Sequence, residues 1–75
     1  MIADWYYMSF VDGDSWLGGC YVQGFDPIHA VRVAHILGCN PGGEVAILGP
    51  LDEEPPADQQ NRLLDRAEVE GVAYN

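Results

Sequence analysis

Histidine and cysteine side chains at helical spacing are the first candidates for chemistry in this chain. His35 and Cys39 lie four residues apart, so a continuous helix would place both on one face, as two metal ligands require. A structural zinc site needs four ligands, so Cys20 and His29 would have to converge on the same point. Cys39 also lies beyond the expected end of that helix. We therefore expect no metal and two free thiols, with Cys39 closing the helix end against Ala34 and His35 at the surface; whether the two thiols lie close together stays open.

Nucleophilic catalysis is a second possibility, because Ser, Cys, His and acidic residues are all present. A catalytic nucleophile needs a base and an orienting acid within hydrogen-bond reach. No local pattern in the sequence pairs these residue types. The sequence therefore predicts a non-enzymatic protein without a cofactor, and a small enzyme is the least favoured alternative.

Backbone amides offer a third kind of site, at the glycine-rich stretch Asn40-Pro41-Gly42-Gly43. Successive N–H groups in such a stretch can form a nest for a phosphate. However, this stretch follows a helix C-terminus, the negative end of the helix dipole, and no Lys or Arg is adjacent in sequence. A structural turn is the favoured interpretation, and the loop remains the alternative binding site.

Composition describes one small acidic domain. Hydrophobic residues make up 48% of 75 residues, which is a large apolar surface for so short a chain to bury alone. Six of the eight aromatic residues lie between Trp5 and Tyr21. We therefore expect self-association into a homo-oligomer through an aromatic surface.

The formal charge is −9, from twelve acidic residues against three arginines and no lysine. Phosphate-based nucleic-acid binding and attachment to an anionic membrane both need clustered cations, so neither is expected. A basic protein partner is compatible with this charge, and the alternative is that acidity only keeps the protein in solution. No leader-like segment precedes Trp5, no apolar run approaches 18 residues, and the cysteines fit a reducing compartment, so we expect a cytoplasmic protein.

The elements that must position these residues begin with a helix whose start and stop signals agree. Asp26 is a good N-cap, Pro27 suits the first helical position, and Gly38 can take the conformation that ends a helix. The spacing predicts an apolar arc that would face the sheet; its members are Ala30, Val31, Val33, Ala34 and Leu37.

Before the helix, residues 5–11 and 16–23 predict a β-hairpin around a four-residue turn at 12–15. With Val11 opposite Trp16, simple alternation places Gly18, Cys20 and Val22 on the face of Trp5, and Tyr21 on the other. A bulge that bends the strand, or the helix packing over Gly18, would explain Gly18 and Gly19 inside this strand. A ligand or a second subunit against Gly19 is the functional alternative.

After the helix, residues 44–48 predict a short strand covered on both faces. If it lies against the first strand, the result is an α+β domain of ββαβ type. Its three-stranded antiparallel sheet has the order 2-1-3, with one covering helix and one uncovered face. We assign residues 1–51 to this core and residues 52–75 to an acidic, proline-containing linker with a short C-terminal helical segment at 61–71, within a single domain. Asp65 would cap that helix, with Glu68 three residues later.

Three stretches together resemble a known family: residues 5–10 (WYYMSF), residues 37–45 (LGCNPGGEV) and residues 61–64 (NRLL). They are similar to small uncharacterised proteins of actinobacteriophages and actinobacterial genomes. The hairpin is tighter here than in the longer relatives, and the acidic linker differs. The family has no established activity, so the resemblance assigns no residue a role. It implies a phage gene product that acts in a bacterial cytoplasm.

The predicted function is therefore that of a phage-encoded interaction protein that occupies a host bacterial factor. The alternative is counter-defence by sequestering a small nucleotide signal in a pocket between subunits, where aromatic rings stack on the base and arginines bind the phosphates. The candidate binding residues for either function are Trp5, Tyr7, Trp16, Tyr21, Arg32, Arg62 and Arg66.

Overall fold

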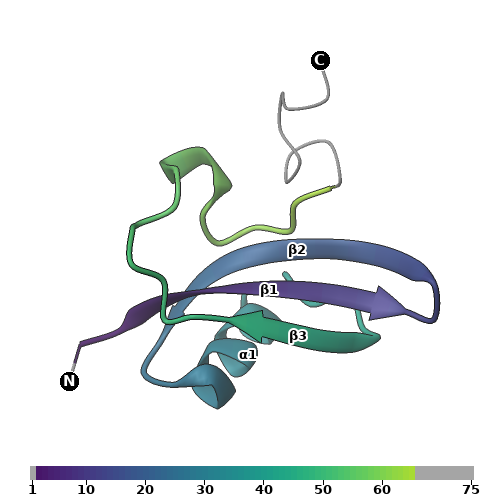
Figure 1. Cartoon of the computed structure of the whole chain (residues 1–75), viewed down its shortest axis with the longest axis horizontal. Coiled ribbons are helices and arrows are strands. Elements are labelled where there is room, and N and C mark those ends of the chain that lie inside the picture. The colour runs from purple at the N-terminus through teal and green to yellow at the C-terminus, as the bar shows by residue number, and fades with distance from the viewer. Residues whose placement is uncertain (1, 66–75) are drawn as a thin grey trace.

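The computed structural model describes residues 2–65 and confirms the predicted α+β architecture. Its elements are β1 (Asp4–Asp12), β2 (Ser15–Gly24), α1 (Pro27–Ile36), β3 (Glu44–Leu48) and a 3₁₀ turn, η1 (Ala57–Gln59). The three strands form one antiparallel sheet in the order β2-β1-β3, and α1 lies on one of its faces (Figure 1). Both the strand order and the covering helix agree with the prediction.

The hairpin between β1 and β2 contains a β-bulge that the predicted face assignment did not include. Val11 pairs with Trp16 as expected, but Phe10 pairs with Gly18, so Leu17 has no partner on β1. One extra residue on one strand exchanges the faces of all residues beyond it. The predicted face assignment is therefore wrong from Gly18 onward, and Tyr21 lies directly opposite Tyr7.

The turn itself is shorter than predicted. Asp12 and Ser15 pair with each other, which leaves a two-residue turn at Gly13 and Asp14. Gly13 has a φ of 61°, the positive value that the first position of a tight hairpin turn demands. The aspartates at the turn are exposed.

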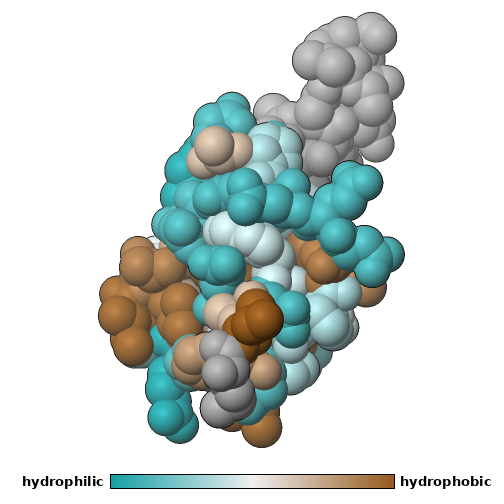
Figure 2. All heavy atoms as spheres, turned by 90° about the vertical axis from the view of Figure 1, so that its left-hand side faces the viewer, coloured by the Kyte–Doolittle hydropathy of each residue, from teal (hydrophilic) through white to brown (hydrophobic). Residues whose placement is uncertain are grey.

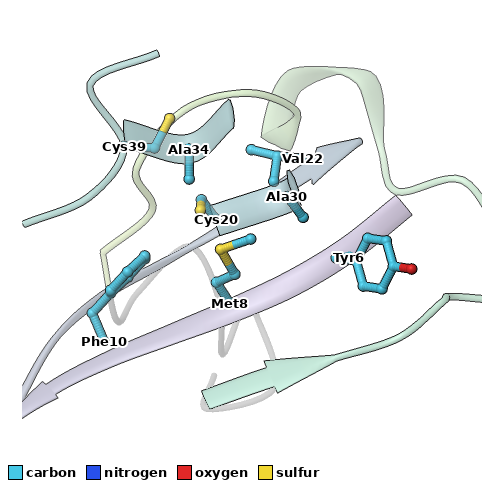
Figure 3. Close-up of a cluster of buried hydrophobic side chains, with 8 residues drawn as sticks. All are labelled: Tyr6, Met8, Phe10, Cys20, Val22, Ala30, Ala34 and Cys39. Carbon is cyan, nitrogen blue, oxygen red and sulfur yellow. The ribbon is translucent and has the colours of Figure 1, made fainter. Parts of the chain in front are cut away.

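The core lies between α1 and the face of the sheet on which α1 packs. Its buried members are Tyr6, Met8, Phe10, Cys20, Val22, Ala30, Ala34 and Cys39 (Figure 3). A Cβ built on Gly24 would lie 2.6 Å from the backbone nitrogen of Ala30, so the helix backbone packs directly on the end of β2. The close approach of the helix is thus at Gly24, and the prediction that it occurs at Gly18 is wrong.

Both ends of α1 agree with the sequence signals. The Asp26 carboxylate accepts a hydrogen bond of 2.8 Å from the backbone N–H of His29. At the other end Gly38 has a φ of 76°, and the Cys39 N–H donates to the Ala34 carbonyl at 2.8 Å. This is the predicted closure of the helix by Cys39. Leu37, predicted to be buried, is 47% exposed because the helix ends at the residue before it.

Strand β3 contradicts the prediction that both of its faces are covered. All five of its residues are exposed. The reason is the position of α1, which packs across β2 and part of β1 and leaves β3 at the open side of the sheet. A short apolar run therefore marked an edge strand here and not a buried one.

The chain after β3 returns to the opposite edge of the sheet. Within the acidic segment Pro55 is buried and its carbonyl accepts from the Gln60 side chain at 2.8 Å. Residues 60–64 then run along β2, where Leu64 and Gly19 exchange backbone hydrogen bonds of 2.7 and 3.1 Å. Leu64 is fully buried.

This pairing replaces the first part of the predicted C-terminal helix. Residues 61–65, the first part of the predicted helical segment, are not helical, so the prediction is wrong there, and Leu64 pairs with the edge of the sheet. The remainder of that predicted helix, with Glu68 and Arg66, lies outside the described residues. Leu63 and Leu64 also explain Gly18, because a Cβ there would lie 2.8 Å from Leu63 Cδ1.

Candidate interaction site

The sheet face opposite α1 gathers the four predicted aromatic residues. Tyr7 pairs with Tyr21, and Trp5 and Trp16 lie on the same face by alternation and by the pairing of Trp16 with Val11. All four residues are half-buried, and α1 packs on the opposite face of the sheet. We call these four residues the aromatic face. The bulge at Leu17 brings them together, because without it Tyr21 would point into the core.

Two of the rings are fixed against each other at the centre of this face. The centroids of Tyr7 and Tyr21 lie 5.0 Å apart with an interplanar angle of 50°, a tilted arrangement that aromatic pairs favour. The Tyr7 hydroxyl lies over Gly19, in the space that a Cβ would need. In this structure Tyr7 therefore occupies the position for which we considered a ligand or second subunit.

Trp16 is held by a hydrogen bond within the same face. Its indole Nε1–H donates to the Ser9 Oγ at 2.7 Å. Burial raises the pKa of Tyr7, with smaller contributions from Tyr21 and Cys20, while a side-chain hydrogen bond with Ser9 opposes the shift. Tyr7 therefore remains a neutral phenol at physiological pH. The face offers fixed rings and neutral polar groups, which suit binding better than proton transfer.

The arginines are not all brought to this face. Arg32 lies on α1, and the sheet therefore separates it from the aromatic rings. Arg62 is exposed and its Nε–H donates to the Asp58 carbonyl at 2.7 Å, one residue after Asn61 bonds the edge of β2 at Tyr21. Arg66 lies outside the described residues. Within one chain, rings and Arg32 cannot contact the same small ligand.

A second surface, which sequence reasoning missed, is an apolar groove of about 470 Å³ between α1 and β3. Its lining residues are Ile28, Val31, Arg32, His35, Asn40 and Ile47. Ile28 is 77% exposed and Ile47 is 36% exposed. Figure 2 shows hydrophobic side chains at the surface on the end of the molecule where α1 begins and β3 ends. In the sequence, the signal that could have indicated this groove is Ile28, an isoleucine outside the predicted apolar arc of the helix.

The loop at Asn40–Gly43 is organised as a turn. The Asn40 side chain accepts from the Gly42 N–H at 2.8 Å, which uses a donor that a phosphate nest would need. Gly43 has a φ of 74°, and a Cβ there would overlap the Val11 carbonyl oxygen. These glycines are explained by the return of the chain to β3.

The candidate metal ligands are distributed over different environments. Cys20 and Cys39 are buried free thiols in the core, close enough for each side chain to affect the other's pKa. His35 is exposed, while the His29 ring stacks on Phe25 at 4.9 Å and accepts from the Phe25 N–H at 3.0 Å. Among residues 2–65, no three His, Cys, Asp or Glu side chains come together in a way that could hold a metal ion.

The thiols are also poor nucleophiles in this setting. Burial, with contributions from Cys39, raises the pKa of Cys20 to about 12. Burial also raises the pKa of Cys39, although a hydrogen bond from Cys20 opposes the shift. The reactive form of a cysteine is the thiolate, so both thiols are inert at neutral pH. Neither has a histidine as a hydrogen-bond partner in the described structure.

No helix in the described part of the chain combines the length and apolar character needed to cross a bilayer. Comparisons of the chain with models of protein families, with curated proteins and with solved structures found no match.

Proposed function

We propose that this chain is a non-enzymatic interaction protein that binds a protein partner through the aromatic face. The observation that carries the proposal is the convergence of Trp5, Tyr7, Trp16 and Tyr21 on one sheet face that α1 leaves uncovered. Tryptophan and tyrosine are the residues that most often dominate the energy of protein interfaces. Three of the rings are held in place, Tyr7 and Tyr21 by their mutual contact and Trp16 by its bond to Ser9, so binding need not order them.

The partner that fits this surface presents arginine or lysine side chains. Aromatic rings attract cations over their faces, and the protein as a whole carries a net charge of −9. Glu44, opposite Val11 on the neighbouring strand, adds a carboxylate to this side of the sheet. Because charge steers encounter, association should slow as salt is added.

The resemblance to actinobacteriophage proteins supplies the setting for the proposal: the partner is a host factor in a bacterial cytoplasm. Sequestration of a nucleotide signal is less well supported, because it needs rings and arginines at one place. The sheet separates Arg32 from the aromatic face. That function would require an interface that joins the two surfaces from different subunits.

Capture from an actinobacterial lysate, with mass spectrometry of both proteins and small molecules, tests the proposal. The bait is the full chain, compared with Trp5→Ala, Tyr21→Ala and the control Ile36→Ala, whose side chain is exposed on the helix. We expect a protein that is lost with the aromatic variants and retained by the control. A nucleotide lost with Arg32→Ala, without any such protein, would replace this proposal by the sequestration function.

A further inference from the structure

Among residues 2–65, one edge of the sheet is paired with another segment of the chain, and the other edge is not. The outer edge of β2 is closed by residues 60–64, which bond Gly19 and Tyr21 through the backbone. The outer edge of β3 pairs with nothing in the described part of the chain. An edge strand of this kind presents a row of free backbone donors and acceptors to any further strand.

Strand β3 also lacks the devices that usually protect an edge. Natural edge strands carry inward-pointing charges, prolines or bulges. Here the only charged residue is Glu44 at the first position, and the side chains that follow are Val45, Ala46, Ile47 and Leu48. The side chains of Val45, Ile47 and Leu48 are 39%, 36% and 64% exposed, respectively. An apolar, unpaired edge beside an apolar groove is a surface suited to a partner strand.

We propose that the strand occupying this edge is β3 of a second copy of the chain, in antiparallel pairing about a two-fold axis at Ala46. Ile47 faces Met8 and Val45 faces Phe10, so both point to the helix side. The two-fold axis then sets Val45 of each copy opposite Ile47 of the other, which forms a β-branched cluster at the floor of the two grooves. The sequence of β3 is thus complementary to itself.

Charge and symmetry are compatible with this pairing. Glu44 of each copy falls opposite Leu48 of the other, so the two carboxylates stay at opposite ends of the paired strands. The product is a six-stranded sheet with both copies of α1 on one side and the aromatic face twice on the other. The expected homo-oligomer therefore forms through β3 and leaves the aromatic face free, where the sequence alone indicated that the aromatic surface would be buried.

The expected dimer is weak and depends on salt in a characteristic way. Two five-residue strands with their flanking side chains bury an area at the low end of specific interfaces, below about 1,200 Å². Each copy carries a charge of −9, and salt screens the repulsion between copies. Dimerisation should therefore strengthen as salt rises, in the opposite direction to the binding of a basic partner.

Sedimentation equilibrium of the purified full chain over a micromolar to submillimolar range tests the inference. The variant Ala46→Lys places two like charges directly opposite at the two-fold axis, and its matched control is Ala57→Lys, at an exposed residue of η1 with the same change in net charge. We expect Ala46→Lys to weaken dimerisation at least about tenfold and the control to leave it unchanged, with both variants matching the native circular dichroism.

A cross-linking variant keeps the test independent of how well Ala46→Lys folds. Directly opposed residues in antiparallel strands bring their Cβ atoms about 4.5–5.5 Å apart, close to the separation that a disulfide spans. With oxidised glutathione as the oxidant, Ala46→Cys should form a covalent dimer and Ala57→Cys should not. A monomer at all concentrations, or equal cross-linking of both variants, would overturn the inference. The inference does not rest on the proposed function, since only purified protein is used.

Discussion

Tyr7 and Tyr21 face each other across β1 and β2 with ring centroids 5.0 Å apart, and they do so because Leu17 is bulged out of the hairpin. The single extra residue rotates the second half of β2, so that Cys20 enters the core and Tyr21 leaves it. One local irregularity therefore creates both the packed side and the aromatic side of the sheet.

Gly19→Ala should disturb the centre of the aromatic face. The added Cβ would overlap the Tyr7 hydroxyl and lie 2.9 Å from the Met8 carbonyl oxygen. We expect a loss of about 1–3 kcal/mol in the free energy of unfolding, measured with urea, because overpacking forces side chains off their rotamers. If the clash with Tyr7 is the cause, the loss should shrink in a Tyr7→Ala background; an equal loss there would contradict the assignment.

Ser9→Ala tests the bond that fixes Trp16. The variant leaves the indole N–H without its acceptor at 2.7 Å, in a partly buried position. The expected loss is about 1 kcal/mol in the free energy of unfolding, with a change in the tryptophan fluorescence of the folded protein. Ser9→Thr, which keeps the hydroxyl, is the matched comparison. Unaltered fluorescence in Ser9→Ala would mean that the bond does not hold the ring.

Asp26→Ala removes the N-cap of α1. The backbone N–H of His29 then loses the acceptor that it contacts at 2.8 Å, and we expect the free energy of unfolding to fall by about 1 kcal/mol. Asp26→Asn retains a capping oxygen and should keep most of the stability. Thermal unfolding of the two variants in parallel separates the cap from the charge. Equal losses in both variants would show that the carboxylate acts through its charge.

The buried thiols predict a decline in stability at high pH. The pKa of Cys20 is raised from 9.0 to about 12 in the folded protein, so the unfolded chain loses this proton first as pH rises. The free energy of unfolding should therefore be unaffected by Cys20 below pH 9 and fall between about pH 9 and 12. Cys20→Ala should reduce that slope, and the raised pKa of Tyr7 explains part of what remains. A slope identical to that of the native protein would contradict the assignment.

Much of the fold could be predicted because its signals are local. Asp26, Pro27 and Gly38 specify the ends of α1 through backbone bonds within a few residues, and the structure confirms them. The antiparallel order of the strands follows from a short hairpin and one crossover helix. Local chemistry thus determined the frame of the domain.

The parts that could not be predicted depend on contacts between distant residues. The bulge at Leu17 is not marked by its own residue type. Gly18 beside it has a φ of 146° and also packs against Leu63 in the distant C-terminal segment. The exposure of β3 depends on the exact path of α1, and a buried strand with the same five residues would look identical in sequence. The sequence named the four rings as candidates, but their common face required the bulge.

The affinity of the purified chain for the captured host protein tests the central claim most directly. Calorimetric titrations would compare the native chain with Trp5→Ala and Tyr21→Ala, and with Ile36→Ala as a control at an exposed apolar residue of the helix. We predict that each aromatic variant weakens binding at least about tenfold, since truncating an interface hot spot typically costs about 2 kcal/mol, while the control binds as the native chain does. Folded aromatic variants that bind normally, together with loss of binding in a folded Gly42→Val variant, would contradict the claim and place the site at the loop before β3.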